Sequence, residues 1–160
     1  MRYLRGTTSR GITYGPNGSS EIEGYADADF AGDLNSRQST SGYVFMLGNG
    51  AISWMSKRQA TITLSTTEAE YISACAAAQE AIYLRRLAID LHHEVTNATV
   101  LYQDNQGAIA IEKDFISNRR LKHIDIKVHF IQEHLANRNI LCYVGYACRL
   151  PYKTSWTPHK

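Results

Sequence analysis

Three acidic residues of this sequence, Asp27, Glu70 and Asp104, stand where a predicted strand or helix begins or ends. Carboxylates that crowd together repel one another and raise one another's pKa values unless cations neutralise them. Their hard oxygens suit Mg²⁺, and two such ions roughly 3.5–4 Å apart activate water and stabilise the leaving oxygen of a phosphodiester. If the fold gathers the three residues at one edge of a sheet, the set indicates metal-dependent hydrolysis of a phosphodiester.

Residues 65–71, Ser-Thr-Thr-Glu-Ala-Glu-Tyr, open the longest predicted helix. Serine and threonine are favoured at N-caps because their hydroxyls accept a bond from an unpaired backbone N–H. Both Ser65 with Glu68 and Thr67 with Glu70 match a capping box. One glutamate suffices for a cap, so the other is a first-turn carboxylate available for chemistry. In the structural alternative, both acids only complement the positive end of the helix.

The first acid of the set has a rival. Residues 21–31 are predicted to form a strand, and its two-residue alternation puts Tyr25, Asp27 and Asp29 on one face. Acidic residues are depleted from strands, so two on one face indicate either solvent exposure or a metal site. Asp29 therefore competes with Asp27 for the first position.

Length and composition bound the possible classes of protein. With 160 residues and 44% apolar content, the chain is expected to form one domain with a real core. It has no apolar run long enough for a membrane span, and its first 20 residues lack the apolar core of a signal peptide. We therefore expect an intracellular protein, cytoplasmic or nuclear, with no membrane partner. The three cysteines show no metal-ligand spacing.

Charge is distributed unevenly along the chain. Residues 119–160 carry a net charge of +6 and residues 1–118 a net charge of −4, so the overall +2 hides two different regions. An acidic pocket beside a basic flank suits a polyanionic substrate that is met through metal ions. A plain solvated surface with scattered charges would give the same totals.

The hydrophobic patterns predict an α/β fold with a mixed five-stranded sheet and flanking helices. Three closely spaced strands are expected to form an antiparallel meander, with a tight turn at residues 48–50. Two further strands alternate with helices. The predicted strands are 21–31, 42–47, 51–56, 98–103 and 140–144, and the predicted helices are 65–93, 105–113 and 124–136.

Six motifs follow one another along the chain: YADADFAGD (25–33), RQSTSGYVF (37–45), ISW (52–54), STTEAEY (65–71), DNQ (104–106) and KHID (122–125). In this order they closely resemble the RNase H domain of copia-type retrotransposon Pol polyproteins. The likeness covers about residues 21–146. Residues 1–20 look like a remnant of the preceding reverse-transcriptase domain with a linker, and residues 147–160 form an aberrant tail that we expect to be disordered.

The resemblance implies an RNase H-like fold and hydrolysis of the RNA strand of an RNA–DNA hybrid with two Mg²⁺ or Mn²⁺ ions. It also implies a reverse-transcriptase domain as partner in the parent polyprotein. Asp27, Glu70 and Asp104 match the family's catalytic, metal-binding acids, Asp29 is a possible further ligand, and Glu68 is left to the cap. Residues expected to contact nucleic acid are Lys57, Arg58, Asn105, Arg119, Arg120, Lys122 and His123.

One departure from the family pattern bears on activity. RNase H sites normally have a fourth acid, which in this family lies in an Ala-Asp pair after the fifth strand, yet residues 134–160 contain no Asp or Glu. If Ala147, Cys148, Arg149 and Leu150 are encoded with a suitable arginine codon, reading one nucleotide later yields Ala-Asp. The sequence thus indicates a shifted reading frame. Two functions stay open: a weakened ribonuclease, or a decayed fragment that binds nucleic acid without cleaving it.

Overall fold

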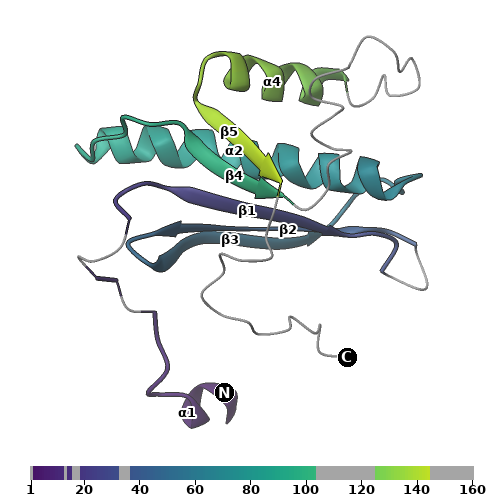
Figure 1. The fold of residues 1–160 in the computed structure, drawn as a ribbon. Helices are drawn as coiled ribbons and strands as arrows, with labels where there is room; N and C mark the ends of the chain where they lie inside the picture. The colour runs from purple at the N-terminus through teal and green to yellow at the C-terminus, as the bar shows by residue number, and fades with distance from the viewer. Residues whose placement is uncertain (1, 13, 16–18, 33–36, 104–124, 145–160) are drawn as a thin grey trace.

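A computed structural model describes residues 2–12, 14–15, 19–32, 37–103 and 125–144. Its centre is a five-stranded mixed sheet in the order β3-β2-β1-β4-β5, with helices packed against it (Figure 1). The α/β architecture and the mixed sheet agree with the sequence prediction. The predicted helix 105–113 lies outside the described residues.

The antiparallel half of the sheet is the predicted meander. It consists of β1 (Glu23–Asp29), β2 (Thr40–Leu47) and β3 (Gly50–Arg58). Gly48 and Asn49 connect β2 to β3 with φ angles of 59° and 66°, the left-handed conformation that two-residue hairpin turns need. Both strands run further than predicted, because the ladder continues through polar residues to the pair Thr40–Arg58.

The other half of the sheet is parallel. β4 (Thr99–Gln103) lies beside β1, and β5 (Ile140–Val144) lies beside β4. In the β1–β4 register Tyr25 is opposite Tyr102. The central position of β1 follows from this arrangement, since it pairs with β2 on one side and β4 on the other.

The long helix α2 (Thr66–Asp90) covers one face of the sheet (Figure 1). Ser65 is its N-cap: the Glu68 N–H donates to Ser65 Oγ at 3.2 Å. The buried face of α2 combines the large side chains Tyr71, Ile82 and Leu84 with several alanines. The buried alanines are Ala69, Ala74, Ala77, Ala78, Ala81 and Ala88.

A second helix, α4 (Asp125–Ala136), packs beside α2 through Ile131, which is buried in the common core. The predicted helix 124–136 is thus confirmed. The short helix α1 (Arg2–Gly6) lies away from the sheet in Figure 1. None of the described helices combines the length and hydropathy needed to cross a bilayer.

The segment before β1 contacts the β2–β3 hairpin. The Tyr14 hydroxyl donates to the Ala51 carbonyl at 2.7 Å, and the Gly15 N–H donates to the Gly48 carbonyl at 3.3 Å. A Cβ at Gly50 would collide with the Tyr14 ring. Part of the predicted linker is therefore seated on the sheet.

Candidate active site

Asp27 lies on β1, the central strand of the sheet. Its neighbour across the β1–β2 ladder is Gly42, which has no side chain, and beyond Gly42 comes Ser56 on β3. The Asp27 side chain is exposed, and its Oδ1 accepts a hydrogen bond from the Ala28 N–H at 2.8 Å. The carboxylate of Asp27, on the central strand, is therefore accessible to a ligand.

The two glutamates in the first turns of α2 have different surroundings, and Glu68 lies at the cap as predicted. Glu68 serves the cap, because its Oε2 accepts a hydrogen bond from the Leu64 N–H at 2.7 Å while its own N–H binds Ser65. Glu70 lies two residues further on and is buried, with 8% of its surface exposed. The alternative capping box of Thr67 with Glu70 does not form the N-cap, which is Ser65.

A direct hydrogen bond joins the helix of Glu70 to the strand of Asp27. Ser73, one helical turn after Glu70, donates from its Oγ to the Asp27 backbone carbonyl at 2.6 Å. Residues three apart on a helix share a face, and both Glu70 and Ser73 are buried. The helical turn that carries Glu70 therefore lies over the strand segment that carries Asp27.

Asp104 lies outside the described residues. It follows Gln103, the last residue of β4, and β4 is the strand next to β1. The Gln103 side chain is buried, and neither its Oε1 nor its Nε2 has a hydrogen-bond partner within the described part of the chain. The third acid thus follows in sequence directly after the end of the strand that neighbours Asp27.

Asp29 is engaged in the turn after β1. A Cβ at Gly32 would collide with the Asp29 carboxylate, so this side chain folds back over the Gly32 backbone. Within the same turn Ala31 has a φ of 51°. Asp29 is exposed and on the same face as Asp27, but its carboxylate lies against the turn.

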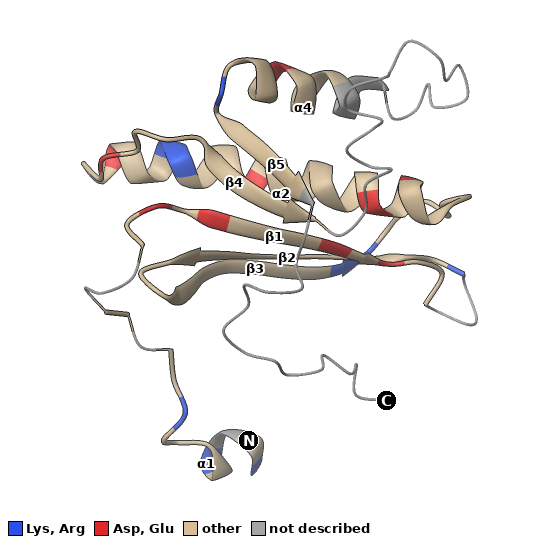
Figure 2. Cartoon of the chain, in the orientation of Figure 1, with Lys and Arg blue, Asp and Glu red and all other residues tan. Residues whose placement is uncertain are grey.

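Basic residues lie at the same end of the fold. Lys57 and Arg58 are exposed at the end of β3, and Arg58 shares a row across the sheet with Asp29 through Thr40. Figure 2 shows the blue end of β3 at the same end of the fold as the red segments at the end of β1 and at the start of α2. The other predicted nucleic-acid contacts lie outside the described residues: Asn105, Arg119, Arg120, Lys122 and His123.

Comparison with known proteins identifies homologues of this chain. No protein-family model matches the chain. It is 44% identical over 143 residues to the Retrovirus-related Pol polyprotein from transposon TNT 1-94 of Nicotiana tabacum, a match over 88% of this chain. It is 38% identical over 84% of its length to the Pol polyprotein from transposon RE1 of Arabidopsis thaliana. The chain is homologous to the Pol polyproteins of copia-type retrotransposons.

Solved structures agree on the fold of this Pol homologue. LC11-RNase H1, isolated from compost, superposes with a TM-score of 0.57 at 14% identity, over 81% of this chain and 86% of that one. The same protein in complex with an RNA/DNA hybrid gives a TM-score of 0.50 at 13% identity, over 78% and 86% of the two chains. Prototype foamy virus protease–reverse transcriptase gives 0.57 at 17% identity, over 92% of this chain and 20% of that one. The chain therefore has an RNase H fold.

The Pol homologue spans about a tenth of the length of the two transposon polyproteins, namely 10% and 9%. These relatives therefore indicate which segment of a polyprotein the chain resembles.

The donor set of this site fits a hard divalent cation. Asp27 and Glu70 offer carboxylate oxygens, the ligands that Mg²⁺ prefers, and a third carboxylate follows β4 in the sequence. Within the described part of the chain no three histidine, cysteine or acidic side chains form a metal cluster by themselves. Asp104, the third predicted acid, lies outside the described residues.

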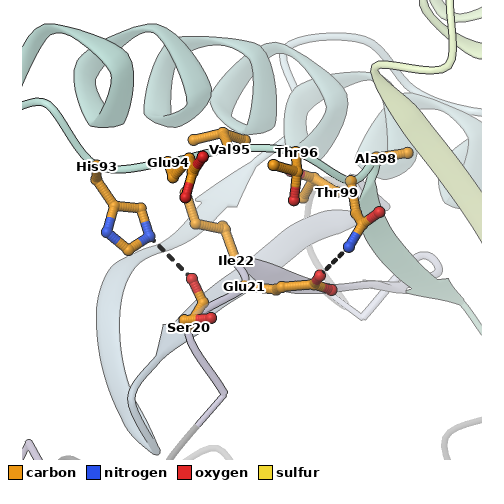
Figure 3. A pocket seen from close by; sticks show the side chains of 10 residues that line it. Ser20, Glu21, Ile22, His93, Glu94, Val95, Thr96, Ala98 and Thr99 are labelled. Atoms are coloured by element: carbon orange, nitrogen blue, oxygen red, sulfur yellow. Dashed lines mark hydrogen bonds between the residues drawn. The ribbon is translucent and has the colours of Figure 1, made fainter.

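The pocket at the opposite end of the sheet is a different feature. It has a volume of about 240 Å³ and lies between the start of β1 and the segment after α2 (Figure 3). His93 Nε2 is 2.9 Å from the Ser20 carbonyl, and Asn97 donates to Glu21 across its opening. It contains none of the predicted catalytic residues.

Two ionisable groups away from the site have shifted pKa values. Burial, followed by the nearby Glu80 carboxylate, raises the pKa of Tyr43 on β2. Burial lowers the pKa of Arg85 on α2, whose Nη1 donates to the Asn97 carbonyl at 2.6 Å. Both groups belong to the packing of α2 against its neighbours.

Two buried polar residues, Ser73 and Gln59, bond the first turns of α2 to the strands and were not predicted from the sequence. Gln59 donates from its Nε2 to the carbonyl of Ala69, the residue before Glu70, at 2.9 Å. The sequence around each of the two residues does not indicate these bonds, because their partners lie 10 to 46 residues away in the sequence.

Proposed function

We propose that this chain carries the site of an RNase H-type endonuclease, which hydrolyses the RNA strand of an RNA–DNA hybrid with divalent metal ions. The observation that carries the proposal is the hydrogen bond from Ser73 to the Asp27 carbonyl, which seats the Glu70 turn on the Asp27 strand. The RNase H fold and the homology to Pol polyproteins support it.

Each acid has a distinct task in this proposal. Asp27 and Glu70, with Asp104, bind two Mg²⁺ or Mn²⁺ ions through their carboxylate oxygens. When bound, the ions supply an activated water and stabilise the charge on the leaving oxygen. Glu68 holds the helix start, as its bond to the Leu64 N–H indicates, and the contact of Asp29 with Gly32 favours Asp27 as the metal ligand of β1.

Substrate binding relies on positive charge beside the acidic site. We propose that Lys57 and Arg58, with Asn105, Arg119, Arg120, Lys122 and His123, contact the hybrid. Phosphate contacts position a duplex without reading its bases, and selection of the RNA strand requires recognition of A-form shape and of the 2′-hydroxyl. One RNase H structure with this fold is in complex with an RNA/DNA hybrid. A reverse-transcriptase domain is the proposed partner in the parent polyprotein.

A second function, binding without cleavage, is favoured by a specific observation. Residues 134–160 contain no acidic residue, so the fourth acid of the family is missing from its expected place. Fewer carboxylates mean less charge and less control over the second ion, and small errors in geometry reduce rate steeply. We therefore propose that the chain as written binds hybrids and cleaves them weakly or not at all.

Metal binding tests the proposed site without requiring activity. The full chain is titrated with Mn²⁺ by isothermal calorimetry, together with Asp27→Asn and the matched variant Asp29→Asn. We expect Asp27→Asn to abolish measurable binding, because it removes a charged ligand, and Asp29→Asn to keep the affinity within about threefold, since its carboxylate lies against Gly32.

Hybrid binding, measured by fluorescence anisotropy, provides the control. It should survive in both variants, because basic side chains supply much of the phosphate attraction. Loss of Mn²⁺ binding in Asp29→Asn with retention in Asp27→Asn would reverse the assignment of the first ligand.

A further inference from the structure

A group of buried polar side chains ties the first turns of α2 to the strands below. Each is at most 6% exposed, and none has a role in the proposed chemistry. We name the group the polar clamp; its members are Ser39, Ser41, Gln59, Thr63 and Ser73. Burying such groups costs free energy unless they are hydrogen-bonded, so their concentration at this end of the fold requires a reason.

Gln59 holds the residue that precedes Glu70. Its Nε2 donates to Ser41 Oγ on β2 at 2.8 Å and to the Ala69 carbonyl on α2 at 2.9 Å. A carbonyl can only accept, so the atom facing Ala69 has to be the amide nitrogen. One side chain thereby joins β2 to the first turns of the helix.

Ser73 holds the helix on the other side of Glu70. Its Oγ lies 2.6 Å from the Asp27 carbonyl and 3.2 Å from the Gly42 carbonyl, so its single proton is shared between β1 and β2. Glu70 is therefore enclosed between two tethers, one at Ala69 and one at Ser73.

The remaining members of the polar clamp fix the loops around the site. Ser39 Oγ accepts from the Ala31 N–H at 3.1 Å and lies 2.8 Å from Thr63 Oγ1. The Ser39 carbonyl accepts from the Gln59 N–H at 2.8 Å. The turn after Asp29 and the segment that leads into the α2 cap are thus linked through one buried serine.

Hydrogen bonds restrict the position of α2 on the sheet more than the apolar contacts of the same interface do. They are directional and weaken when their geometry is distorted, whereas the apolar contacts of α2 are non-directional. Two carboxylates that share a cation need fixed relative positions. We propose that Gln59 and Ser73 are positioning residues of the metal site, which set the place of the Glu70 turn over Asp27; this inference rests on the proposed function.

The test compares metal affinity with stability in the full chain. Gln59→Met keeps the shape of the side chain and removes its donors, and Ser73→Ala removes the hydroxyl. The matched control is Thr99→Val, which removes a buried hydroxyl bonded to Arg85 at 3.2 Å toward the far end of α2. Mn²⁺ affinity is measured by calorimetry and the unfolding temperature by circular dichroism.

We expect Gln59→Met and Ser73→Ala each to weaken Mn²⁺ binding about tenfold, the order seen when supports of metal ligands are removed. Thr99→Val should lower the unfolding temperature comparably and leave the affinity within about twofold. Ser41→Ala, which removes one acceptor of Gln59, replaces Gln59→Met if that variant does not fold.

Two results would contradict the inference in distinguishable ways. If the clamp variants weaken Mn²⁺ binding no more than Thr99→Val does, the polar clamp is merely structural, while the metal site itself stands. If the unaltered chain binds Mn²⁺ no better than Asp27→Asn, the proposed metal site is wrong, and the positioning role is wrong with it.

Discussion

At the scale of single residues, neighbours of the same type can have different backbone surroundings. Glu68 and Glu70 are two residues apart on one helix, and both are buried. Glu68 accepts a bond from the Leu64 N–H, whereas Glu70 lies between the tethers at Ala69 and Ser73. The capping pattern Ser-x-x-Glu therefore separates a structural glutamate from a candidate metal ligand.

Exchange of each glutamate for its amide tests this separation. Glu70→Gln should abolish Mn²⁺ binding with little loss of stability, because it removes a ligand charge. Glu68→Gln should keep Mn²⁺ affinity within about threefold and lower the free energy of unfolding by about 0.3–1 kcal/mol, the usual value of a favourable charge at a helix start. Calorimetry and urea denaturation measure the two effects. Equal losses of metal affinity in both variants would show that the two roles are not separate.

At the scale of elements, close packing beneath α2 depends on a glycine of the central strand. A Cβ at Gly24 on β1 would lie 2.5 Å from both Leu101 Cδ2 and Phe45 Cε1. Those two side chains are almost fully buried, so they fill the space that Gly24 leaves open. The row Phe45–Gly24–Leu101 thereby joins the antiparallel and parallel halves of the sheet.

Gly24→Ala should lower the free energy of unfolding by about 1–3 kcal/mol, the range for added volume in a packed core. The matched variant is Gly42→Ala on β2, where the nearest atom to the new Cβ is the Met55 carbonyl oxygen at an ordinary 3.6 Å. Urea denaturation of both variants gives the comparison. If Gly42→Ala lowers the free energy of unfolding as much as Gly24→Ala does, crowding is not what distinguishes the two positions.

At the scale of the whole molecule, local patterns predicted the elements better than their connections. The cap at Ser65 and the hairpin turn at Gly48 and Asn49 are each encoded within a few residues. The reach of β2 to Thr40 was missed, because that part of the ladder is polar. The tethers from Gln59 and Ser73 could not be found, because hydrogen bonds over long sequence separations leave no local periodicity.

For the candidate site too, local sequence signals indicated residues but not the long-range contacts between them. Spacing and motif order indicated Asp27 and Glu70, and the geometry of α2 on β1 adds how the two are held. The choice of Asp27 over Asp29 gained support only from the contact of Asp29 with the Gly32 backbone, which depends on the conformation of a turn. Asp104 stays a prediction from the sequence.

We propose that this fold carries a metal-dependent ribonuclease site that lacks one acid. The most direct test measures cleavage of the RNA strand of a labelled RNA–DNA hybrid, with and without Mg²⁺. Three proteins are compared: the chain as written, the chain with the shifted frame restored after Tyr146 so that it regains Ala-Asp, and the restored chain with Asp27→Asn. We predict Mg²⁺-dependent cleavage by the restored chain, little or none by the chain as written, and none by the Asp27→Asn variant. Robust cleavage by the chain as written, or by the restored chain without Asp27, would contradict the claim.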